Sequence, residues 1–300
     1  MNEQSSGGQI VVQPYVVLFT DVLGQKEDIG RLEKLPRNDA ERAQYAEALQ
    51  KSAGKVIGLR KHIATFINHY LDPLPGKSTP EQGSTFESLK KNRMKLQYFA
   101  DTVIAYAPLL GDREANLGQV CATVYNASVA MLFGFARGMA IRGGIDVGVA
   151  LELSDRDLYG PVAAAAYHLE KCTATWPRIV VGDNAVRFLD EYVNDATRLS
   201  VAALKQRVNI CKELVTTDEE GVHYVDFLGR GFLEVCPANM LETLREDVRQ
   251  GFRFVEREHE RLRKGPPSKA KHAELDLGRR YELLRNYFES RVRYWKITTT

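Results

Sequence analysis

One segment, Glu114–Met139, constrains the fold most, because the helix that it predicts is apolar on nearly every side. Other elements have to cover a helix of this kind all round. Apolar runs with strand patterns precede and follow it, at residues 10–19, 95–108 and 141–153. Strands and helices in this order predict an α/β or α+β domain in which helices cover a sheet.

Flanking segments extend this core. From Asn38, a residue type that favours a helix N-cap, a long helical pattern runs to about Tyr70. Residues 72–88 contain three prolines and predict a long exposed loop. An alanine-rich helix is expected to begin near Pro161 after a further loop. Later segments predict a strand (178–182), a helix (184–193) and a strand pair (222–235) that turns at Gly229-Arg230-Gly231.

The residues after 240 predict two amphipathic helices, separated by the GPPSK segment at 265–269. We expect both helices to pack on the core, and a helical dimer contact is the alternative. Their apolar stripes are Leu241, Val248, Phe252, Val255 and Leu262, followed by Leu277, Tyr281, Leu284, Phe288 and Trp295.

The composition excludes several classes of protein. With 44% hydrophobic and 27% charged residues over 300 positions, the chain is globular in type. Its 41 basic residues nearly balance its 39 acidic ones, which argues against nucleic acid as a partner. No run of about 18 apolar residues predicts a membrane span, and the N-terminus shows no secretion signal. A cytoplasmic, reduced chain is expected, since the cysteines fit no C-x-x-C spacing: Cys121, Cys172, Cys211 and Cys236.

Two aspartates stand out by their positions. Asp21 closes the first apolar strand directly before a turn that contains Gly24, and Asp101 lies where two short strands meet. A carboxylate in apolar surroundings is costly unless it is paired or bound to a cation. Two carboxylates brought together repel each other, and Mg²⁺ or Mn²⁺ relieves that repulsion, while amides of the turn at 22–24 would face a phosphate. The alternative is that Asp21 caps the following segment and Asp101 turns a hairpin.

Four segments also follow one another in a recognisable order: Phe19–Gly24 (FTDVLG), Phe99–Ala105 (FADTVIA), Arg142–Gly148 (RGGIDVG) and Asp157–Glu170 (DLYG, then an alanine-rich helix ending in LE). They resemble the F-x-D-I-x-G, G-D-x-x-x-A, R-x-G-I-H-x-G and D-x-[WY]-G-x-x-V-N-x-A-x-R-L-E motifs of class III nucleotide cyclases. The resemblance implies an α+β cyclase fold with a ferredoxin-like βαββαβ core. It divides the chain into a catalytic domain (12–236), an insertion within it (about 37–90) and a C-terminal helical extension (237–300).

The chain departs from the family pattern in its helix. Ala164 stands in place of the transition-state Asn, His168 in place of the Arg, and Gln97 in place of the Lys that reads adenine. The two aspartates are 80 residues apart, more than in the usual cyclase domain. A degenerate helix with an extended region and a helical tail is similar to the uridylate and cytidylate cyclases of bacterial Pycsar antiphage defence.

The resemblance implies a homodimer with its active site at the subunit interface. Two Mn²⁺ or Mg²⁺ ions would bind Asp21, Asp101 and the main-chain carbonyl of Val22; one would lower the pKa of the ribose 3′-hydroxyl and the other would hold the triphosphate. His168 would donate to the α-phosphate, with helix packing as the alternative, and we expect Arg142 to form a structural ion pair. The implied nucleotide contacts are Phe19, Leu23, Gly24, Gln97, Asp157 and Arg230, the last with a solvated turn as its alternative.

The expected activity is conversion of UTP to 3′,5′-cyclic UMP, a second messenger that would act through a cyclic-nucleotide-gated effector in antiphage defence. Synthesis of cyclic CMP is the nearest alternative. An inactive cyclase-homology dimerisation module is another, which the retention of Asp21 and Asp101 disfavours. A palm-type enzyme such as a diguanylate cyclase is a third, and the absence of a G-G-[DE]-E-F string disfavours it.

Overall fold

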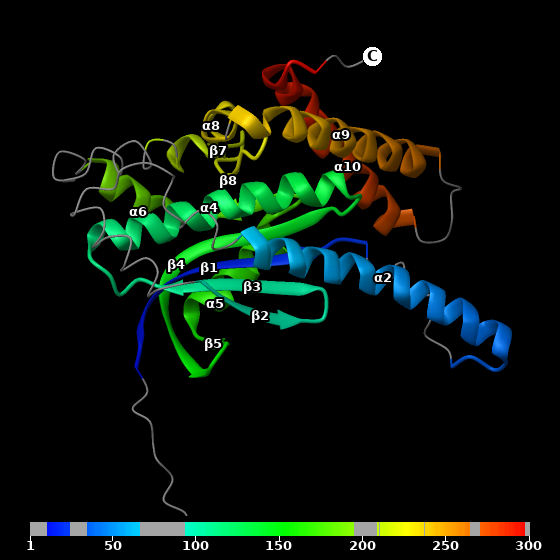
Figure 1. Cartoon of the computed structure of the whole chain (residues 1–300), viewed down its shortest axis with the longest axis horizontal. Helices are drawn as coiled ribbons and strands as arrows, with labels where there is room; N and C mark the ends of the chain where they lie inside the picture. The colour runs from blue at the N-terminus through cyan, green and yellow to red at the C-terminus, as the bar shows by residue number, and fades with distance from the viewer. Residues whose placement is uncertain are drawn as a thin grey trace, which may run out of the picture.

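The protein is an α+β fold in which helices pack on a mostly antiparallel eight-stranded sheet, as the sequence predicts (Figure 1). The computed structural model describes residues 11–24, 35–66, 94–194, 209, 211–236, 238–264 and 271–297. The strands are β1 (Gln13–Val22), β2 (Lys95–Phe99), β3 (Thr102–Pro108), β4 (Ile141–Ser154), β5 (Asp157–Tyr159), β6 (Ile179–Val181), β7 (Val215–Thr217) and β8 (His223–Val225). The helices are α2 (Asp39–Phe66), α4 (Arg113–Ala136), α5 (Pro161–His168), α6 (Asp183–Asn194), α8 (Arg230–Val235), α9 (Leu241–Lys264) and α10 (Lys271–Val292), with short turns η2 (Leu169–Thr173), η4 (Ala238–Met240) and η5 (Arg293–Trp295).

Strand β1 lies inside the sheet, whose order is β2-β3-β1-β4-β6-β8-β7, with β5 paired to β4. It runs antiparallel to both β3 and β4, and β2 and β3 form a hairpin at one edge. The register pairs Asp21 with Thr102 of β3 and with Arg142 of β4. The end of β1 therefore meets the turn between β2 and β3, where Asp101 lies.

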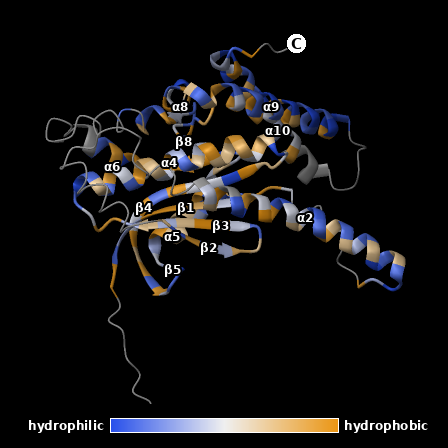
Figure 2. Ribbon diagram, viewed as in Figure 1, coloured by the Kyte–Doolittle hydropathy of each residue, from blue (hydrophilic) through white to orange (hydrophobic). Residues whose placement is uncertain are grey.

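Helix α4 is the central helix of the core, as its apolar sequence predicts. Asp112 caps it by accepting a hydrogen bond from the Ala115 N–H at 2.8 Å. Figures 1 and 2 show this largely apolar helix between the sheet and α9. By length and composition α4 is able to span a membrane, but 89% of its most apolar window is buried inside the protein. Its hydrophobicity is thus accounted for by packing within the fold.

Helix α2 follows its predicted pattern only in part. Asn38 caps it, accepting a hydrogen bond from the Glu41 N–H at 2.9 Å. The expected apolar stripe is buried at Leu59 and Ile63, in the half of α2 that contacts α4. Leu49 of the same stripe is 49% exposed, because the first half of α2 extends past the sheet (Figure 1).

Helices α9 and α10 pack on the core as two amphipathic helices, as predicted. α9 lies against α4, and α10 lies against α9. Val248 and Phe252 of α9 join the hydrophobic cluster of β1 and α4, as do Leu284 and Phe288 of α10. The C-terminal helices therefore share one core with the sheet. Three predictions fall outside the described residues: the break at 265–269, the helix end near Tyr70 and the loop at 72–88.

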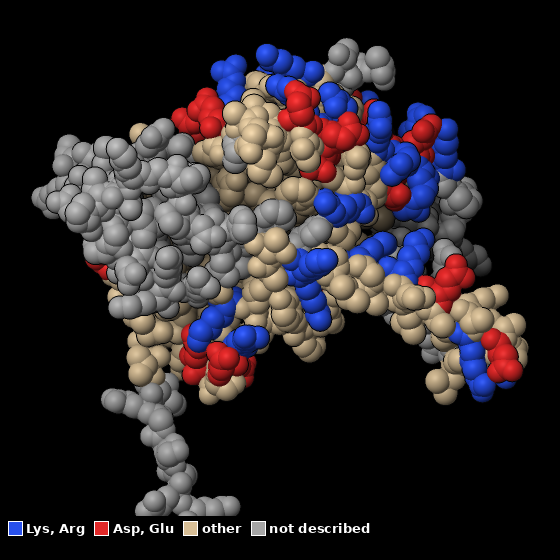
Figure 3. All heavy atoms as spheres, in the orientation of Figure 1, with Lys and Arg blue, Asp and Glu red and all other residues tan. Residues whose placement is uncertain are grey.

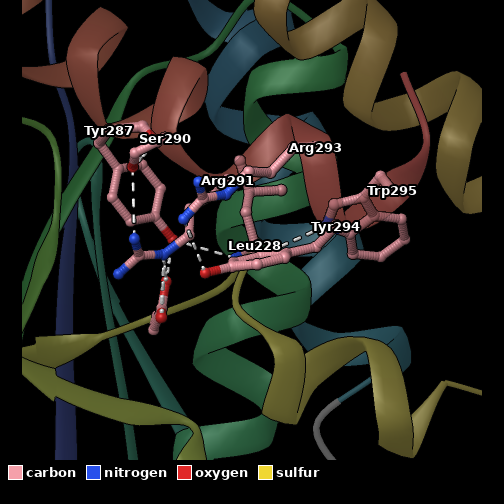
Figure 4. Close-up of polar contacts among 8 residues, drawn as sticks. Leu228, Tyr287, Ser290, Arg291, Arg293, Tyr294 and Trp295 are labelled. Carbon is pink, nitrogen blue, oxygen red and sulfur yellow. Dashed lines mark hydrogen bonds and ion pairs between the residues drawn. The ribbon is translucent and has the colours of Figure 1, made fainter. Parts of the chain in front are cut away.

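The predicted strand pair at 222–235 is wrong. β8 pairs instead with β7, and the residues from Arg230 form helix α8. The Leu228 N–H donates to Tyr287 Oη at 3.0 Å, and the Leu228 carbonyl accepts from Trp295 Nε1 at 3.0 Å (Figure 4). The side chains of Tyr287 and Trp295 thus form hydrogen bonds with the N–H and carbonyl groups that Leu228 would have used to pair with a second strand.

The loop predicted before α5 contains a strand instead. Asp157–Tyr159 form β5, which pairs with the end of β4 after a tight turn in which Arg156 adopts a φ of 66°. Pro161 is the first residue of α5, as predicted. As a consequence, Asp157 is fixed on a strand and not on a loop.

Candidate active site

The structure brings Asp21 and Asp101 together at the end of β1. Asp21 is the second-last residue of this strand, and its partner across the register, Thr102, directly follows Asp101. Ala100 and Asp101 form the turn between β2 and β3, with Ala100 at a φ of 49°. Both aspartates are partly buried. Their juxtaposition is the condition that the predicted cation site requires.

The electrostatics of Asp21 reflect this crowding. Burial is the largest cause that raises the pKa of Asp21 from its ordinary value of 3.8 to about 6, and the negative charges of Asp101 and Glu170 add to it. The positive charges of Arg142 and Lys171 act in the opposite direction with a smaller effect. A carboxylate in this state is stabilised by a proton or by a bound cation.

A buried ion pair lies beside Asp21. Arg142 Nε donates to Glu170 Oε1 at 2.6 Å, and the two side chains are 9% and 3% exposed. Glu170 belongs to η2, a π-helical turn that continues α5. Gly144 of β4 permits this approach, because a Cβ atom there would lie 2.4 Å from the Ala166 carbonyl oxygen. The structural ion pair predicted for Arg142 is confirmed.

The residues next to Asp21, on β1 and in the turn after it, are held by packing, by a backbone hydrogen bond and by the conformation of Gly24. Phe19 packs edge-on against a tyrosine ring of α5, with the ring centroids 5.3 Å apart, and Val22 is buried. The Leu23 N–H donates to the carbonyl of Ala140 at 2.8 Å, so this one of the three expected turn amides is used within the fold. Gly24 adopts a φ of 88°, which glycine reaches without the strain of a side chain.

Gln97 and Asp157, the predicted base contacts, touch each other. Gln97 Nε2 donates to Asp157 Oδ1 at 3.4 Å, and Gln97 Oε1 accepts from the Leu158 N–H at 3.3 Å. Across β2, β3 and β1 the register places Gln97 in one row with Phe19. Because strand residues two apart share a face, Gln97 and Asp21 lie on the same face of the sheet.

Two further predicted site residues, His168 and Arg230, lie on helices. His168 ends α5 and is exposed. Arg230 begins α8, next to β8, and the order β1-β4-β6-β8 separates it from β1. Its guanidinium lies over the ring of Tyr294, 5.0 Å from the centroid. Within one chain, Arg230 therefore contacts the C-terminal segment.

The donor set at the end of β1 suits a hard cation. Asp21 and Asp101 offer carboxylate oxygens and Val22 offers a main-chain carbonyl, the ligand types that Mg²⁺ and Mn²⁺ prefer. Across the described part of the chain, no group of three or more His, Cys, Asp and Glu side chains is arranged to hold a metal ion. A cation here would have two side-chain ligands, and phosphate oxygens of a substrate would complete its coordination.

Several charged neighbours of the site are not evident from the sequence. Glu170 and Lys171 act on Asp21 from far along the chain. The Leu169–Glu170 motif is the one local signal for them. Lys51 and Lys55 of α2 line a cavity that also reaches the turn after β1, and no pattern within α2 indicates this.

Known protein-family models and curated proteins were both compared with this chain, and none of them matches it. A functional assignment therefore rests on the arrangement of the residues themselves. The features that carry it are the carboxylate pair of Asp21 and Asp101, the contact of Gln97 with Asp157, and the sheet face that these residues share.

Proposed function

We propose that this chain is a nucleotide cyclase that converts UTP to 3′,5′-cyclic UMP and pyrophosphate. The single observation that carries the proposal is the juxtaposition of Asp21 and Asp101, with its effect on the pKa of Asp21. The topology supports it as well. The order β2-β3-β1-β4, with helices after β1 and β3, is that of a ferredoxin-like βαββαβ unit, the core that the resemblance to class III cyclases implies.

Asp21, Asp101 and the Val22 carbonyl would hold two Mn²⁺ or Mg²⁺ ions. When bound, such ions lower the pKa of the ribose 3′-hydroxyl and neutralise charge on the triphosphate. In the reaction the 3′-oxygen forms a bond to the α-phosphorus, and the bond from that phosphorus to the leaving pyrophosphate breaks. The contribution of the chain is to fix one carboxylate near the end of β1 and the other in the adjoining β2–β3 turn, so that they need little reorganisation when substrate binds.

The contact of Gln97 with Asp157 favours a pyrimidine base. Uracil offers an N3–H donor flanked by two carbonyl acceptors, so Asp157 would accept from N3–H while the Gln97 amide donates to O4. Cytosine offers an amino donor beside the N3 acceptor, and the same pair meets it once the Gln97 amide is turned. UTP is therefore the proposed substrate and CTP the next candidate.

Exposed aromatic side chains support a homodimer. Phe99 is 75% exposed and lies in the same row as Asp21 across β2, β3 and β1. Tyr167 of α5, which packs against Phe19 on the same face, is 48% exposed. A second copy that covers this face would bring its own Gln97–Asp157 pair opposite the aspartates of the first, as twofold symmetry allows.

A catalytically inactive, dimerising module is the second candidate. It is favoured by Ala164 and by the exposed His168, which replace the transition-state Asn and Arg of the family. An inactive module gives no reason to keep Asp21 and Asp101 close together, although their mutual repulsion and burial are unfavourable. The active form would work in the cytoplasm, and its cyclic nucleotide would act on a gated effector protein in antiphage defence.

Product analysis tests this proposal. The purified protein is incubated with each of the four nucleoside triphosphates and Mn²⁺, and the products are identified by mass spectrometry. Cyclic UMP in excess over cyclic CMP and over cyclic purine nucleotides is expected, and none with Asp21→Ala or Asp101→Ala, since each removes a ligand with no substitute. Either alanine variant turning over at the wild-type rate contradicts the two-metal assignment. A folded dimer with no product from any nucleotide supports the inactive module.

A further inference from the structure

The turn that carries Asp101 is held by a contact from outside the sheet. Ala100 and Asp101 alone connect β2 to β3, and Ala100 adopts a φ of 49°. This left-handed conformation is unfavourable for a residue with a side chain, and it persists where surrounding contacts fix it. One such contact comes from helix α2, which belongs to a distant part of the chain.

Arg60 of α2 makes two contacts with this hairpin. Its Nη2 donates a hydrogen bond to the Ala100 carbonyl at 2.6 Å, and its guanidinium lies over the Tyr98 ring, 4.8 Å from the centroid. A charged donor strengthens a hydrogen bond, and an aromatic face attracts a guanidinium at this distance. The Ala100 carbonyl shares one planar peptide group with the Asp101 N–H. The hydrogen bond therefore fixes the peptide plane at which Asp101 begins.

The half of α2 that carries Arg60 is itself anchored in the core. Leu59 and Ile63, which flank Arg60 in sequence, are 1% and 4% exposed, and α2 contacts the central helix α4. Figure 1 shows α2 beside the end of the β2–β3 hairpin, in agreement with the hydrogen bond. Packed and hydrogen-bonded residues thus connect the core, through α2, to the turn of Asp101.

The sequence of α2 leaves the Arg60 guanidinium available for the hairpin. Within this helix, all of which the structure describes, no carboxylate lies one turn from Arg60. The positions three and four residues away, where an intrahelical ion pair would form, hold Val56, Ile57, Ile63 and Ala64. After Glu47 the Lys, Arg, Asp and Glu residues of α2 are all basic, and Figure 3 shows Lys and Arg side chains along this part of the helix.

We propose that Arg60 is a positioning residue for Asp101: it fixes the β2–β3 turn so that the Asp101 carboxylate is held beside Asp21 for a shared cation. This inference rests on the proposed function, because the placement of Asp101 matters for activity only if the two aspartates bind that cation. Arg60 itself contacts neither cation nor substrate. A ligand held loosely, by about 1 Å, weakens a metal site or an active site strongly. Helix α2, within the predicted insertion, thereby contributes to the cation site.

Mn²⁺ binding to the full-length protein, measured from the free-ion signal in electron paramagnetic resonance at pH 7.5, tests the proposal. Arg60→Met keeps an unbranched side chain but removes the donor and the charge, so it is expected to bind Mn²⁺ at least about fivefold more weakly than wild type. Arg60→Lys keeps a cation and a donor and is expected to lie between the two. Arg42→Met is the matched control, because Arg42 lies in the first half of α2 and pairs with Asp39. It is expected to bind as wild type does.

The same variants give a kinetic readout that a general loss of stability does not imitate. In Arg60→Met, the Mn²⁺ concentration for half-maximal cyclic UMP synthesis is expected to rise, while kcat at saturating Mn²⁺ changes less, because excess cation compensates for a loosely held ligand.

Hydrogen exchange distinguishes failure of this proposal from failure of the proposed function. In EDTA, the amides of residues 98–103 are expected to exchange faster in Arg60→Met than in wild type or Arg42→Met, while the amides of α4 exchange alike because the fold is retained. Unchanged exchange at the turn, or wild-type Mn²⁺ affinity in Arg60→Met, overturns the role of Arg60. If wild type binds no Mn²⁺, the cation assignment of the proposed function fails, and the exchange measurement alone decides whether Arg60 holds the turn.

Discussion

Arg142 of β4 and Glu170 of η2 form a buried ion pair directly beside Asp21, with Nε and Oε1 2.6 Å apart. Removing one partner leaves an uncompensated buried charge. We therefore expect Glu170→Gln to lower the free energy of unfolding by about 3–5 kcal/mol. Urea unfolding followed by circular dichroism measures this loss.

The matched control removes both charges of this pair. Replacement of a buried pair by apolar residues of similar size is often neutral for stability. The double variant Arg142→Met, Glu170→Met is thus expected to recover most of the stability that Glu170→Gln loses. Equal destabilisation in the single and double variants contradicts a role of Arg142 as the partner of Glu170.

Asp21 makes stability depend on pH. Its pKa is about 6 in the folded protein, against an ordinary value of 3.8. As pH rises, the unfolded chain therefore releases this proton at a lower pH than the folded protein does. Stability due to this group therefore falls as pH rises from about 4 to about 6 and stays low above that range. The shift corresponds to at most about 3 kcal/mol, and less after allowance for solvent screening. In EDTA, Asp21→Asn is expected to be more stable than wild type at pH 7.5 and to lack this fall.

Addition of Mn²⁺ gives the same site a second readout. A cation that binds only the folded state raises the Tm of the protein that binds it. Wild type and the exposed control variant Glu219→Gln are expected to gain Tm with Mn²⁺, whereas Asp21→Asn gains much less. Identical Mn²⁺ shifts in all three proteins count against a cation at Asp21.

Several parts of this molecule follow from local sequence. The apolar pattern of α4, the cap at Asn38, and the strands that end near Asp21 and Asp101 depend on nearby residues, and the structure contains them. The segment at 222–235 shows where local patterns mislead. The backbone N–H and carbonyl of Leu228 in this segment bond to side chains about 60 residues further on, which no local window of sequence contains.

The candidate site divides in the same way. The meeting of Asp21 with Asp101 follows from two strand ends, each readable on its own. The approach of Glu170 depends on the π-helical turn η2 and on the space that Gly144 leaves. The cavity of Lys51 and Lys55 depends on how α2 and α9 are placed around the sheet, and helix periodicity carries no information on that placement.

Mixing two inactive chains tests whether two subunits share each site. If Asp21 acts with Asp157 of the partner subunit, Asp21→Ala and Asp157→Ala chains complement each other. Random mixing makes half of the dimers mixed, and each mixed dimer has one working site of two. Activity of up to about one quarter of wild type is therefore expected. No recovery, while mass spectrometry shows mixed dimers, contradicts the shared site.

Hydrogen bonds of Tyr287 connect helix α10 to the segment that follows β8. Its hydroxyl donates to Asp226 Oδ1 at 2.8 Å and accepts from the Leu228 N–H at 3.0 Å (Figure 4). Tyr287→Phe leaves a buried N–H without its partner, so a loss of about 1–3 kcal/mol in the free energy of unfolding is expected. Tyr294→Phe is the control, because the partner of its hydroxyl among the described residues is Arg293, at a long distance of 3.4 Å. A loss in the control as large as in Tyr287→Phe shows that the buried contacts are not the cause.

Gln97 tests the proposed choice of base. Its side chain already touches Asp157, so both are placed to meet one base edge. Gln97→Leu keeps a similar volume but removes the amide, which leaves uracil O4 without a donor. A buried acceptor without a partner costs about 1–3 kcal/mol, so kcat/KM for UTP is expected to fall by roughly 10- to 100-fold.

Gln97→Glu is the companion variant: its carboxylate offers no donor to O4 and repels Asp157, so it is expected to lose at least as much. Steady-state kinetics with all four nucleotides measures both. A wild-type kcat/KM for ATP or GTP above those for UTP and CTP overturns the pyrimidine assignment, even if cyclase activity itself is found.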